Sequence, residues 1–488
     1  MTAEKFDSLN PATDEVVATF PVDTADQVRA VVESAQPAAR WWAELGFKGR
    51  AARLRAWRTW LAKHANELAE LMHEENGKPN DDALIEIAIA IEHLDWAARH
   101  APKVLGRDRT GSGLLSVNHS ASVEYRPYGV VGVLGPWNYP VHTPMGSISY
   151  ALAAGNAVVF KPSEYTTAVG AWLVQSFARL VPEHPVLSLV TGLGETGAAL
   201  CRSGVDKLAF TGSTATGKKV MVACAETLTP VVIECGGKDA MIVAGDADVE
   251  AAAEAAAWGG LANAGQTCIG IERVYVVDSV YDEFVAALVS RARTLRPGDD
   301  RTADYGPITM PSQLDVIARH IDEALSAGAT SLVGGRDSVR APYVDPVVLT
   351  DVPADAAIEQ EETFGPVLTI TRVPDEDAAV ARANGTAFGL GASVYSAHRG
   401  RAIAERLRSG MVSINSVLTF ASVPSLPFGG IGDSGFGRIH GSDGLREFAW
   451  SHAVTKRRAP AAIDVTKFGR KPEAIKRMMT LVQARWGR

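Results

Sequence analysis

The amino-acid sequence predicts an α/β fold with two doubly wound parallel-sheet domains. The chain has 488 residues and 47% hydrophobic content. A chain of this length is expected to have more than one hydrophobic core, because single cores stop growing near about 250–300 residues. From about residue 121, short apolar runs alternate with Gly/Pro/Ser turns and helical stretches, and a second block of this alternation begins near Asp246. Strand, helix and strand in this rhythm indicate a parallel sheet with helices on both faces.

The segment before residue 121 predicts helices. Residues 24–45 have Thr24 as a plausible N-cap, and residues 49–79 repeat apolar positions every three or four residues. That second pattern stops at Asn76-Gly77, a typical helix end. A third helix is expected over residues 81–100.

Five strand-then-turn units follow in the first block. They are VVGVLGPWN (130–138), AVVFKPSE (157–164), LSLVTGLG (187–194), KLAFTGS (207–213) and VVIECGG (231–237). In parallel sheets ligands bind beyond the carboxyl ends of the strands. The turns of these five units are therefore candidate binding residues.

The second block begins with an alanine-rich helix that reaches Trp258 and is capped by Asp246 or Asp248. Strands are expected at 272–278, 343–352, 364–373, 389–396 and 411–416, with a helix at 281–298. The glycine-dense stretch 427–438 is either a flexible linker or a shaped loop. We favour a loop anchored by Phe428, Ile431 and Phe436.

Composition excludes several classes of protein. With 48 Lys+Arg against 56 Asp+Glu, a net charge of −8 gives no reason to expect a nucleic-acid partner. Four cysteines without CxxC spacing make no disulfide framework and no zinc or thioredoxin-type site, so no metal is expected. The N-terminus lacks a secretory signal, and no apolar run reaches the ~18–20 residues of a membrane span. We expect a cytoplasmic protein.

Several polar residues at these turns could perform chemistry. Cys268 lies among small and amide residues in NAGQTCIG (263–270). It could be a nucleophile, a redox thiol or a residue with only a packing role. Asn138 could stabilise an oxyanion or could be an ordinary turn residue. Glu234, which ends an apolar strand, could be a general base or a helix-capping acid. Glu362 and Phe364 flank a turn and could hold a ribose and an aromatic ring.

Two turns could hold a dinucleotide. Gly212 and Ser213 open a helix whose free amides attract phosphate, although an ordinary capped turn is an equal alternative. Lys161 and Glu164 could bind both hydroxyls of a ribose, or form a solvated charge pair. A carboxylate there would repel a 2′-phosphate, which favours NAD over NADP.

Taken in order, the motifs resemble those of the aldehyde dehydrogenase superfamily from roughly residue 8 to 458. The matching motifs are NPAT, GPWNYP, KPSE, FTGS with Gly217, E-x-GGK at Glu234–Lys238, GQTC, E-x-FGP at Glu362–Pro366, and the run PFGG-x-G-x-SG-x-G.

The resemblance implies an oxidation of an aldehyde to a carboxylic acid with NAD(P)+. Cys268 would attack the aldehyde to form a thiohemiacetal, whose oxyanion the Asn138 side chain and the Cys268 amide would hold. After hydride transfer, water activated by Glu234 would hydrolyse the thioester. Because a free thiol is only a few per cent ionised at neutral pH, we expect the site to lower the pKa of Cys268.

The resemblance also implies a cofactor site for NAD, with NADP as the alternative because Lys161 and Ser163 could tolerate it. The expected cofactor-binding residues are Pro136, Trp137, Lys161, Ser163, Glu164, Gly212, Ser213, Gly236, Glu362 and Phe364. Motif alignment places Tyr139, Thr143 and Ile269 near the substrate pocket. No arginine is aimed at a second carboxylate, so an apolar or aromatic aldehyde is favoured over a semialdehyde.

Alternatives to this reaction remain. Coenzyme-A-acylating relatives usually lack the acid at Glu234, so its presence favours hydrolysis. An inactive structural or binding protein is the other class, and the intact set of Asn138, Glu234 and Cys268 argues against it. Ser442 falls roughly where many family members carry a further acid, and the tract Ile439-His440-Gly441 resembles the fatty-aldehyde-type branch.

The resemblance sets the domain boundaries. We expect a cofactor-binding domain at 1–116 and 130–233, a catalytic domain at 234–427, and a small β oligomerisation element from strands at 117–129 and 439–458, hence a homo-oligomer. Residues 459–488 form a basic amphipathic extension, predicted helical, with Ile475, Met478, Met479, Val482 and Trp486 on one face. Docking on its own or a neighbouring subunit is favoured over contact with an anionic membrane surface.

Overall fold

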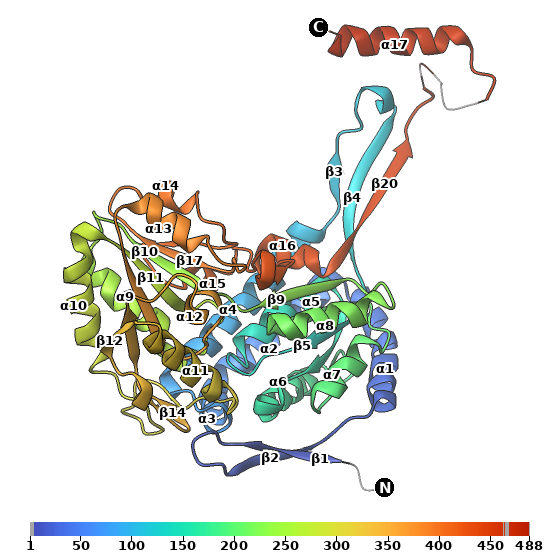
Figure 1. Cartoon of the computed structure of the whole chain (residues 1–488). Coiled ribbons are helices and arrows are strands. Elements are labelled where there is room, and N and C mark those ends of the chain that lie inside the picture. Colours follow the sequence, from blue (N-terminus) through green and yellow to red (C-terminus); the bar gives the residue numbers. More distant parts are fainter. Residues whose placement is uncertain (1–3, 462, 464–467, 488) are drawn as a thin grey trace.

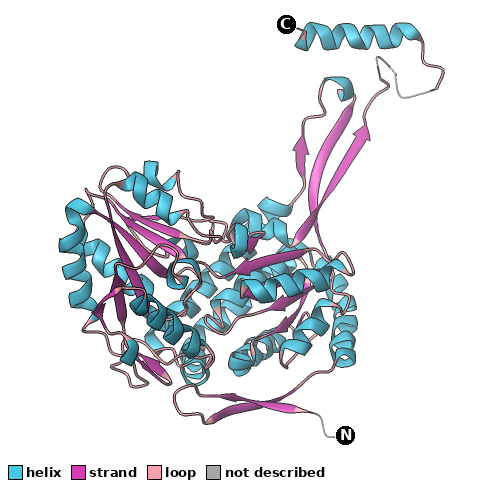
Figure 2. Cartoon of the chain, viewed as in Figure 1, coloured by secondary structure: helices cyan, strands magenta, loops and turns pink. Residues whose placement is uncertain are grey.

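Two large, mainly parallel β-sheets covered by helices organise the chain, as the predicted fold class requires (Figures 1 and 2). The computed structural model describes residues 4–461, 463 and 468–487. A hairpin of β1 (Lys5–Leu9) and β2 (Val16–Pro21) precedes the helices α1 (Ala25–Glu44), α2 (Gly46–Lys63), α3 (Ala65–Asn76) and α4 (Asn80–Leu105).

The caps of these helices follow the sequence signals. Thr24 forms a capping box with Gln27 at the start of α1, which satisfies orphan amides of the first turn. Gly77, at the end of α3, has a left-handed φ of 81°, a conformation that glycine adopts without strain. The predicted helix at 49–79 is divided near His64 into α2 and α3.

The first sheet has the strand order β19-β9-β8-β5-β6-β7. Its strands are β5 (Val130–Leu134), β6 (Ala157–Lys161), β7 (Leu187–Leu189), β8 (Lys207–Gly212), β9 (Val231–Cys235) and β19 (Gly435–Phe436). Helices α5 (His142–Ala154), α6 (Thr167–Leu180), α7 (Gly194–Cys201) and α8 (Thr214–Ala225) cross over between them. All five predicted strand-then-turn units are confirmed.

The order of strands in this sheet reverses between β5 and β8. The chain runs outward from β5 to β6 and β7, then returns beside β5 and runs through β8 to β9. A crevice forms at the carboxyl ends of strands where connections diverge in this way. The turns at residues 135–138 and 212–213 lie at that point.

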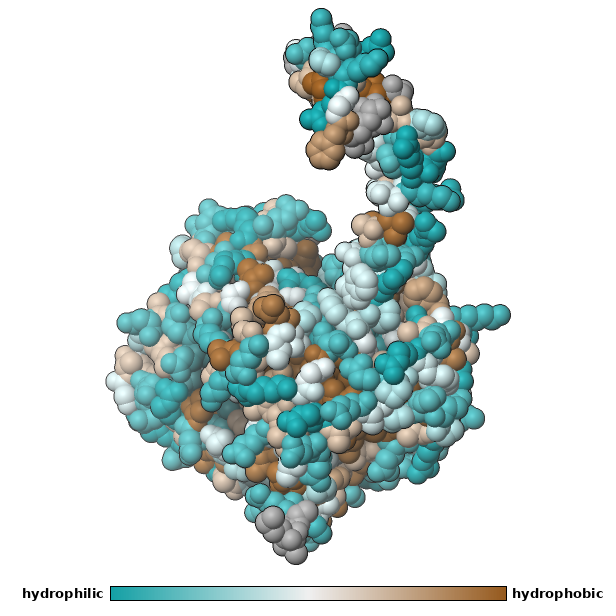
Figure 3. Space-filling model, turned by 90° about the vertical axis from the view of Figure 1, so that its right-hand side faces the viewer, coloured by the Kyte–Doolittle hydropathy of each residue, from teal (hydrophilic) through white to brown (hydrophobic). Residues whose placement is uncertain are grey.

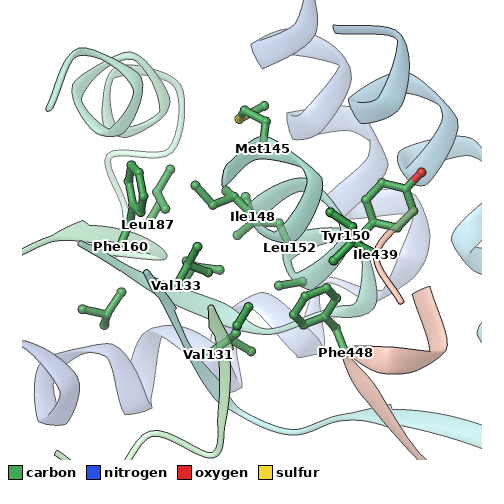
Figure 4. Packing of buried hydrophobic residues seen from close by; sticks show 14 of the residues in the cluster. Val131, Val133, Met145, Ile148, Tyr150, Leu152, Phe160, Leu187, Ile439 and Phe448 are labelled. Atoms are coloured by element: carbon green, nitrogen blue, oxygen red, sulfur yellow. The ribbon is translucent and has the colours of Figure 1, made fainter. Parts of the chain in front are cut away.

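The core between the first sheet and α5 is built from alternate strand residues. Val131, Val133 and Phe160 face Ile148 and Leu152 of α5 in Figure 4, and all five are at most 2% exposed. Burying one such side chain stabilises the fold by about 1.5–3 kcal/mol. The strand ends that carry polar residues are therefore fixed by a close-packed support.

The second sheet has the order β12-β15-β16-β11-β10-β17-β18, in which β12 alone among its named strands is antiparallel to its neighbour. Its strands are β10 (Asp239–Val243), β11 (Ile271–Val277), β12 (Thr330–Val333), β15 (Val347–Thr350), β16 (Val367–Val373), β17 (Ala392–Tyr395) and β18 (Ser413–Ile414); β13 (Val339–Arg340) and β14 (Tyr343–Val344) form a hairpin. The helices are α9 (Val249–Leu261), α10 (Tyr281–Ala292), α11 (Gln313–Ser326), α12 (Ala357–Gln360), α13 (Glu376–Ala383), α14 (Gly400–Ala404), α15 (Thr419–Ser422) and α16 (Gly441–Glu447).

The two candidate caps of α9 have different roles. The Asp248 carboxylate accepts a hydrogen bond of 3.1 Å from the Ala251 amide and is the N-cap. Asp246 accepts hydrogen bonds from the Ser396 hydroxyl and the His398 amide instead. Asp246 therefore joins the start of the second block to the loop after β17.

The glycine-dense stretch 427–438 is a shaped loop, but two of its three predicted anchors are wrong. Phe428 is 6% exposed, whereas Ile431 and Phe436 are 36% and 43% exposed. The anchor is Ser434, fully buried, whose hydroxyl donates to the Gly236 carbonyl and accepts from the Gly389 amide. Phe436 contributes through its backbone, because β19 pairs with β9.

A three-stranded sheet projects from the body and leads to the C-terminal helix (Figures 1 and 2). It consists of β3 (Asp108–Thr110), β4 (His119–Pro127) and β20 (Ala449–Arg457), with the helix α17 (Pro472–Trp486) beyond it. The helix predicted in this extension is confirmed for its described residues, and none of them is buried. Figure 3 shows mostly hydrophilic side chains on this projection, with some hydrophobic ones among them. Trp486 of α17 is 62% exposed.

Among the described residues, none of the helices combines the length and the apolar character that a bilayer span requires.

A buried ion pair ties the helical region to the first sheet. Lys78 and Glu86 form a salt bridge in which each side chain is 1% exposed. Glu86 also accepts hydrogen bonds of 2.8 and 2.9 Å from the amides of Val141 and His142, at the start of α5. Lys78 Nζ donates to the Asn138 carbonyl at 3.0 Å. The pair therefore fixes the segment that connects β5 to α5.

Replacing Glu86 with alanine should destabilise the protein by about 3–5 kcal/mol, because it leaves a buried ammonium group without its partner. Urea unfolding followed by tryptophan fluorescence measures the change. Glu92→Ala, at an exposed position of the same helix, is the matched control and should change the unfolding free energy by less than about 0.5 kcal/mol. Equal effects of the two variants would show that this ion pair does not hold the β5–α5 segment.

Candidate active site

A cleft of about 770 Å³ opens at the carboxyl ends of β5, β6, β8 and β9. The ten predicted cofactor residues all line it, as do Asn138, Glu234 and Cys268. These residues come from strands of the first sheet, from helices and from loops far apart in the sequence, among them the loop before β11 of the second sheet. The fold therefore brings the predicted nucleophile, base and oxyanion donor to one cavity.

The loop that carries Cys268 has an unusual backbone. Asn263, Ala264 and Gly265 have left-handed φ values of 53°, 55° and 69°. A Cβ on Gly265 would lie 2.0 Å from the Gly365 carbonyl oxygen, so only glycine fits there. Three residues in this conformation turn the chain sharply and leave Cys268 half-buried at the cleft.

The side chain of Gln266 holds this loop in place. Its amide nitrogen donates to the carbonyls of Asn263, at 3.0 Å, and Pro307, at 3.1 Å. Its oxygen accepts from the Thr309 amide at 2.8 Å. All its hydrogen-bonding groups are thus used to fix the backbone two residues before the thiol.

Asn138 is fixed against the same loop. Its side-chain nitrogen donates to the Gln266 carbonyl at 3.0 Å, and the residue is 5% exposed. Because an amide nitrogen carries two protons, the second remains available to a ligand beside Cys268. The position of this donor is set by the loop that presents the thiol, which is the arrangement an oxyanion site requires.

Glu234 ends β9 and is 3% exposed. Neither carboxylate oxygen has a hydrogen-bond partner within the part of the chain that the structure describes. Burial raises its pKa to about 8, an effect that the nearby Cys268 and Thr211 side chains reduce and Asp239 increases. A carboxyl group with this pKa is mostly protonated at pH 7. At slightly higher pH it is ionised and can act as a base.

The prediction that the site lowers the pKa of Cys268 is wrong, because the surrounding protein raises that pKa. Burial raises the pKa of the thiol well above its usual range, and the charges of Glu234, Glu362 and Asp239 raise it further. Burial is the larger cause, and the three acidic groups around the sulfur atom add to it. Ionisation of Cys268 is thus linked to the protonation of its acidic neighbours.

Glu362 and Phe364 border the cleft opposite the first sheet. Glu362 accepts from the Gly237 amide at 3.2 Å, and a Cβ on Gly236 would lie 2.1 Å from its carboxylate. Phe364 has a φ of 52°, and its ring meets that of Trp137 edge to face at 5.5 Å. The two rings frame the cleft next to the carboxylate.

Backbone amides and a buried ion pair hold the turn before Phe364. The amides of Thr363 and Phe364 donate to the Glu272 carboxylate, at 2.9 and 3.1 Å. Glu272 in turn pairs with Lys238, whose side chain is 1% exposed. Sequence reasoning identified neither partner, because Glu272 lies within a strand that reads as apolar.

Lys161 and Glu164 lie at the end of β6. The Lys161 ammonium donates to the Pro162 carbonyl at 3.1 Å and lies 4.0 Å from the Glu164 carboxylate. Burial lowers the pKa of Lys161. An ammonium has three protons, so this one can also bind a ligand hydroxyl, and the half-exposed Glu164 can accept from one.

Ser213 caps α8, accepting from the Thr216 amide at 3.3 Å. A Cβ on Gly217 would lie 3.0 Å from Cys235 Sγ, so glycine lets the first turn of the helix pack closely on β9. The N-terminal amides of α8 consequently face the cleft next to Gly212. Such a helix start attracts a phosphate group.

Other lining residues were not predicted as site residues. These are Gly194, Gly197, Arg202, Thr216, Lys219, Met310, Gln313 and Val316, among others. Most lie within helices whose exposed positions carry no motif. The turn 187–194 was a strand-end signal that could have indicated Gly194.

The three predicted substrate-pocket residues do not line this cleft. The Tyr139 hydroxyl lies 3.0 Å from Thr267 Oγ1, next to Cys268 in the sequence, and its ring lies over the Lys78 ammonium at 3.8 Å. Ile269 is 6% exposed. Tyr139 and Ile269 therefore border the Cys268 loop, and they remain candidates for substrate contact.

Comparison with known proteins gives concordant matches. A model described as the aldehyde dehydrogenase family matches residues 1–454. The 4,4'-diapolycopene aldehyde oxidase of Methylomonas sp is 36% identical over 447 residues, which are 91% of this chain and 84% of that protein. The glutarate-semialdehyde dehydrogenase of Pseudomonas putida is 37% identical over 445 residues, 90% of this chain and 92% of that protein.

Solved structures agree. An NADP-dependent enzyme of E. coli matches with a TM-score of 0.88 at 34% identity, covering 93% of this chain and 95% of that one. The NADP-dependent glyceraldehyde-3-phosphate dehydrogenase of Bacillus halodurans C-125, solved with NADP, matches with a TM-score of 0.88 at 30% identity, covering 94% and 97%. The fold of this chain is the fold of these enzymes.

The raised pKa of Glu234 predicts a pH-dependent stability. A carboxyl group with a pKa near 8 when folded and about 4.3 when unfolded favours the folded state most below about pH 4. That contribution declines as the pH rises and is lost above about pH 8. Glu234→Gln should therefore be more stable than the wild type at pH 9, by on the order of 4 kcal/mol, with little difference at pH 5.

Urea unfolding at both pH values measures this difference. Glu254→Gln, at an exposed position on α9, controls for the loss of one carboxylate. A wild-type stability that matched Glu234→Gln at pH 9 would mean that Glu234 ionises at an ordinary pH.

Proposed function

The chain belongs to the aldehyde dehydrogenase family, and we propose that it oxidises an aldehyde to a carboxylic acid with NAD(P)+ through a covalent intermediate on Cys268. One observation carries this proposal: Asn138, Glu234 and Cys268 line the same cavity as the ten candidate dinucleotide contacts. The overall reaction converts aldehyde, NAD(P)+ and water to carboxylic acid, NAD(P)H and a proton.

The cleft suits a dinucleotide. The α8 N-terminus offers amides to a pyrophosphate beside Gly212 and Ser213, and Lys161 with Glu164 offers a donor and an acceptor to a ribose. Glu362 and Phe364 offer a second carboxylate and a ring at the end of the cleft that holds Cys268. When bound, NAD(P)+ supplies an acceptor for the hydride that leaves the substrate carbon.

The first step is addition of the Cys268 thiolate to the aldehyde carbonyl. The free amide proton of Asn138 and the Cys268 backbone amide stabilise the resulting oxyanion. Removing one such donor typically costs about 10²–10³ in rate. Loss of hydride from the thiohemiacetal carbon leaves an acyl thioester on Cys268.

Glu234 serves the second step. It is buried, lacks a hydrogen-bond partner among the described residues and has a pKa of about 8. Its ionised form can remove a proton from a water molecule that attacks the thioester. The products are the carboxylic acid and the free thiol. The same carboxylate can take the thiol proton earlier in the cycle, because the two groups lie side by side.

An apolar or aromatic aldehyde is the substrate class that we favour. Cys268 packs against the large apolar cluster that contains Ile269 and Phe420. The Lys78 ammonium beside Tyr139 is engaged by Glu86 and the Asn138 carbonyl, so it is not free to bind a second carboxylate. The two relatives named above act on different aldehydes, so a semialdehyde is the competing substrate.

The domains follow from the sheets. We assign cofactor binding to 1–116 and 130–233 and the nucleophile to 234–427.

The projecting strands, within 117–129 and 439–458, would pair with a second subunit, since β20 is an edge strand of its sheet. In Figure 1 α17 stands away from the body of its own chain, which favours docking on a neighbouring subunit. Contact with a membrane surface is the alternative.

Activity should be measured as NADH or NADPH production with aliphatic, aromatic and semialdehyde substrates. The wild type should turn over an apolar aldehyde, and Cys268→Ala should reduce the rate by at least about 10³, because the nucleophile is lost. Glu234→Gln should reduce the steady-state rate more than the rate of the first turnover, because the carboxylate can assist the first step but hydrolysis requires it. Full activity in Cys268→Ala would refute the mechanism, and a steady rate that rises only with added coenzyme A would refute hydrolysis.

Cofactor preference should depend on Glu164. Its carboxylate, about one third exposed at the cleft, would repel a 2′-phosphate, so Glu164→Gln should lower KM for NADP by roughly tenfold and raise KM for NAD. Steady-state kinetics with both cofactors measure this. Glu195→Gln, an exposed acid near the start of α7, is the control. An unchanged ratio of the two KM values would place the ribose elsewhere.

A further inference from the structure

Three histidines from separate elements meet inside the first core. They are His93 on α4, His142 at the start of α5 and His440 immediately before α16. One ring nitrogen of each lies within 4.8 Å of the corresponding nitrogen of the other two. The rings of His93 and His440 are 3.9 Å apart between centroids. The catalytic mechanism uses none of the three.

Four of the six ring nitrogens in this cluster are buried without a hydrogen-bond partner among the described residues. His93 Nε2 lies 3.0 Å from the Ala421 carbonyl, which can only accept, so the proton of the neutral ring is on Nε2 and Nδ1 carries a lone pair. That Nδ1, Nδ1 of His142 and both ring nitrogens of His440 are buried with no hydrogen-bond partner among the described residues. His93 and His440 are 0% and 1% exposed. Native proteins rarely leave so many polar atoms unsatisfied in one place.

We propose that these three histidines bind a divalent transition-metal ion, with zinc as the ion that fits best. Zinc binds imidazole nitrogens at about 2.0–2.1 Å, which places tetrahedral ligand atoms about 3.4 Å apart. The ligand nitrogens lie at most 4.8 Å apart, and small rotations of the rings would bring them to that separation. The hydrogen bond from His93 Nε2 to a backbone carbonyl is the outer contact that orients a metal-binding imidazole.

The imidazole ligands and the apolar side chains around them favour a transition-metal ion over calcium or magnesium. Rings of Tyr150 and Phe428 lie 5.7 and 5.5 Å from that of His440, and the apolar side chains of Ile439 and Phe448 lie near Tyr150 in Figure 4. A Cβ on Gly146 would lie 2.5 Å from His440 Nε2, so glycine provides the room. Imidazole nitrogens suit zinc, cobalt and copper, whereas calcium and magnesium prefer oxygen. Water or hydroxide would complete the coordination.

The site would be structural. It would link α4, α5 and the segment that enters α16, which are far apart in the sequence. Its His142 ligand follows Asn138 by one short turn, so a bound ion would brace the segment that carries the proposed oxyanion donor. The sequence predicted no metal, because the three histidines have no common motif and only the fold brings them together.

Metal binding should be measured on full-length Cys268→Ala, which removes the active-site thiol as a competing ligand. Titration with cobalt should give one equivalent bound and the strong visible absorption of a four- or five-coordinate ion. Zinc should displace the cobalt and raise the apparent Tm in proportion to the logarithm of its concentration. These readouts are independent of the proposed oxidation of aldehydes.

Variants of the ligands decide the outcome. Introducing His93→Gln or His142→Gln should abolish the cobalt spectrum and weaken zinc binding at least about 100-fold, whereas His100→Gln, on the same helix as His93 but outside the cluster, should leave both unchanged. His142 is half-buried, so its variant should fold, and far-ultraviolet circular dichroism checks this. Failure of the parent protein to bind one equivalent, or equal binding by the His142 variant, would overturn the proposal.

Discussion

The hydrogen bond from the Asn138 side chain to the Gln266 carbonyl is the constraint on which the site depends, because it joins the two sheets at the reacting atoms. Asn138 follows a strand of the first sheet, and Gln266 precedes a strand of the second. Each partner is held from behind, Gln266 by its own side-chain contacts and Asn138 by the Lys78–Glu86 pair. The proposed oxyanion donor, Asn138, and the proposed nucleophile, Cys268, therefore share one support, and a shift of either sheet would move both.

The electrostatics of the cleft follow from this convergence. Gathering acidic groups around Cys268 makes its ionisation costly, yet the same burial keeps Glu234 protonated near neutrality. Each group also shifts the pKa of the other, because Glu234 raises that of Cys268 and the Cys268 side chain lowers that of Glu234. Such coupling suits a cycle in which the sulfur must first lose a proton and a water molecule must lose one later.

Much of this arrangement could be predicted from the sequence, since the apolar runs at 130–134, 157–161 and 207–212 are strands and their turns carry the cleft residues. What could not be predicted depends on contacts between distant segments. The pKa of Cys268 is raised by burial and by acids from two other stretches, 234–239 and 362. The loop at 427–438 is anchored by Ser434, because its buried hydroxyl finds two backbone partners there. The histidine cluster likewise has no signature in a linear chain.

The short strand β19 has a further consequence for the behaviour of the protein in concentrated solution. Without it, β9 would be the outermost strand of the first sheet and would present unpaired backbone groups beside an apolar surface. Open edges of this kind recruit other chains and promote aggregation. Two residues, Gly435 and Phe436, cap that edge. Damage to this small cover would therefore become evident as turbidity and precipitation.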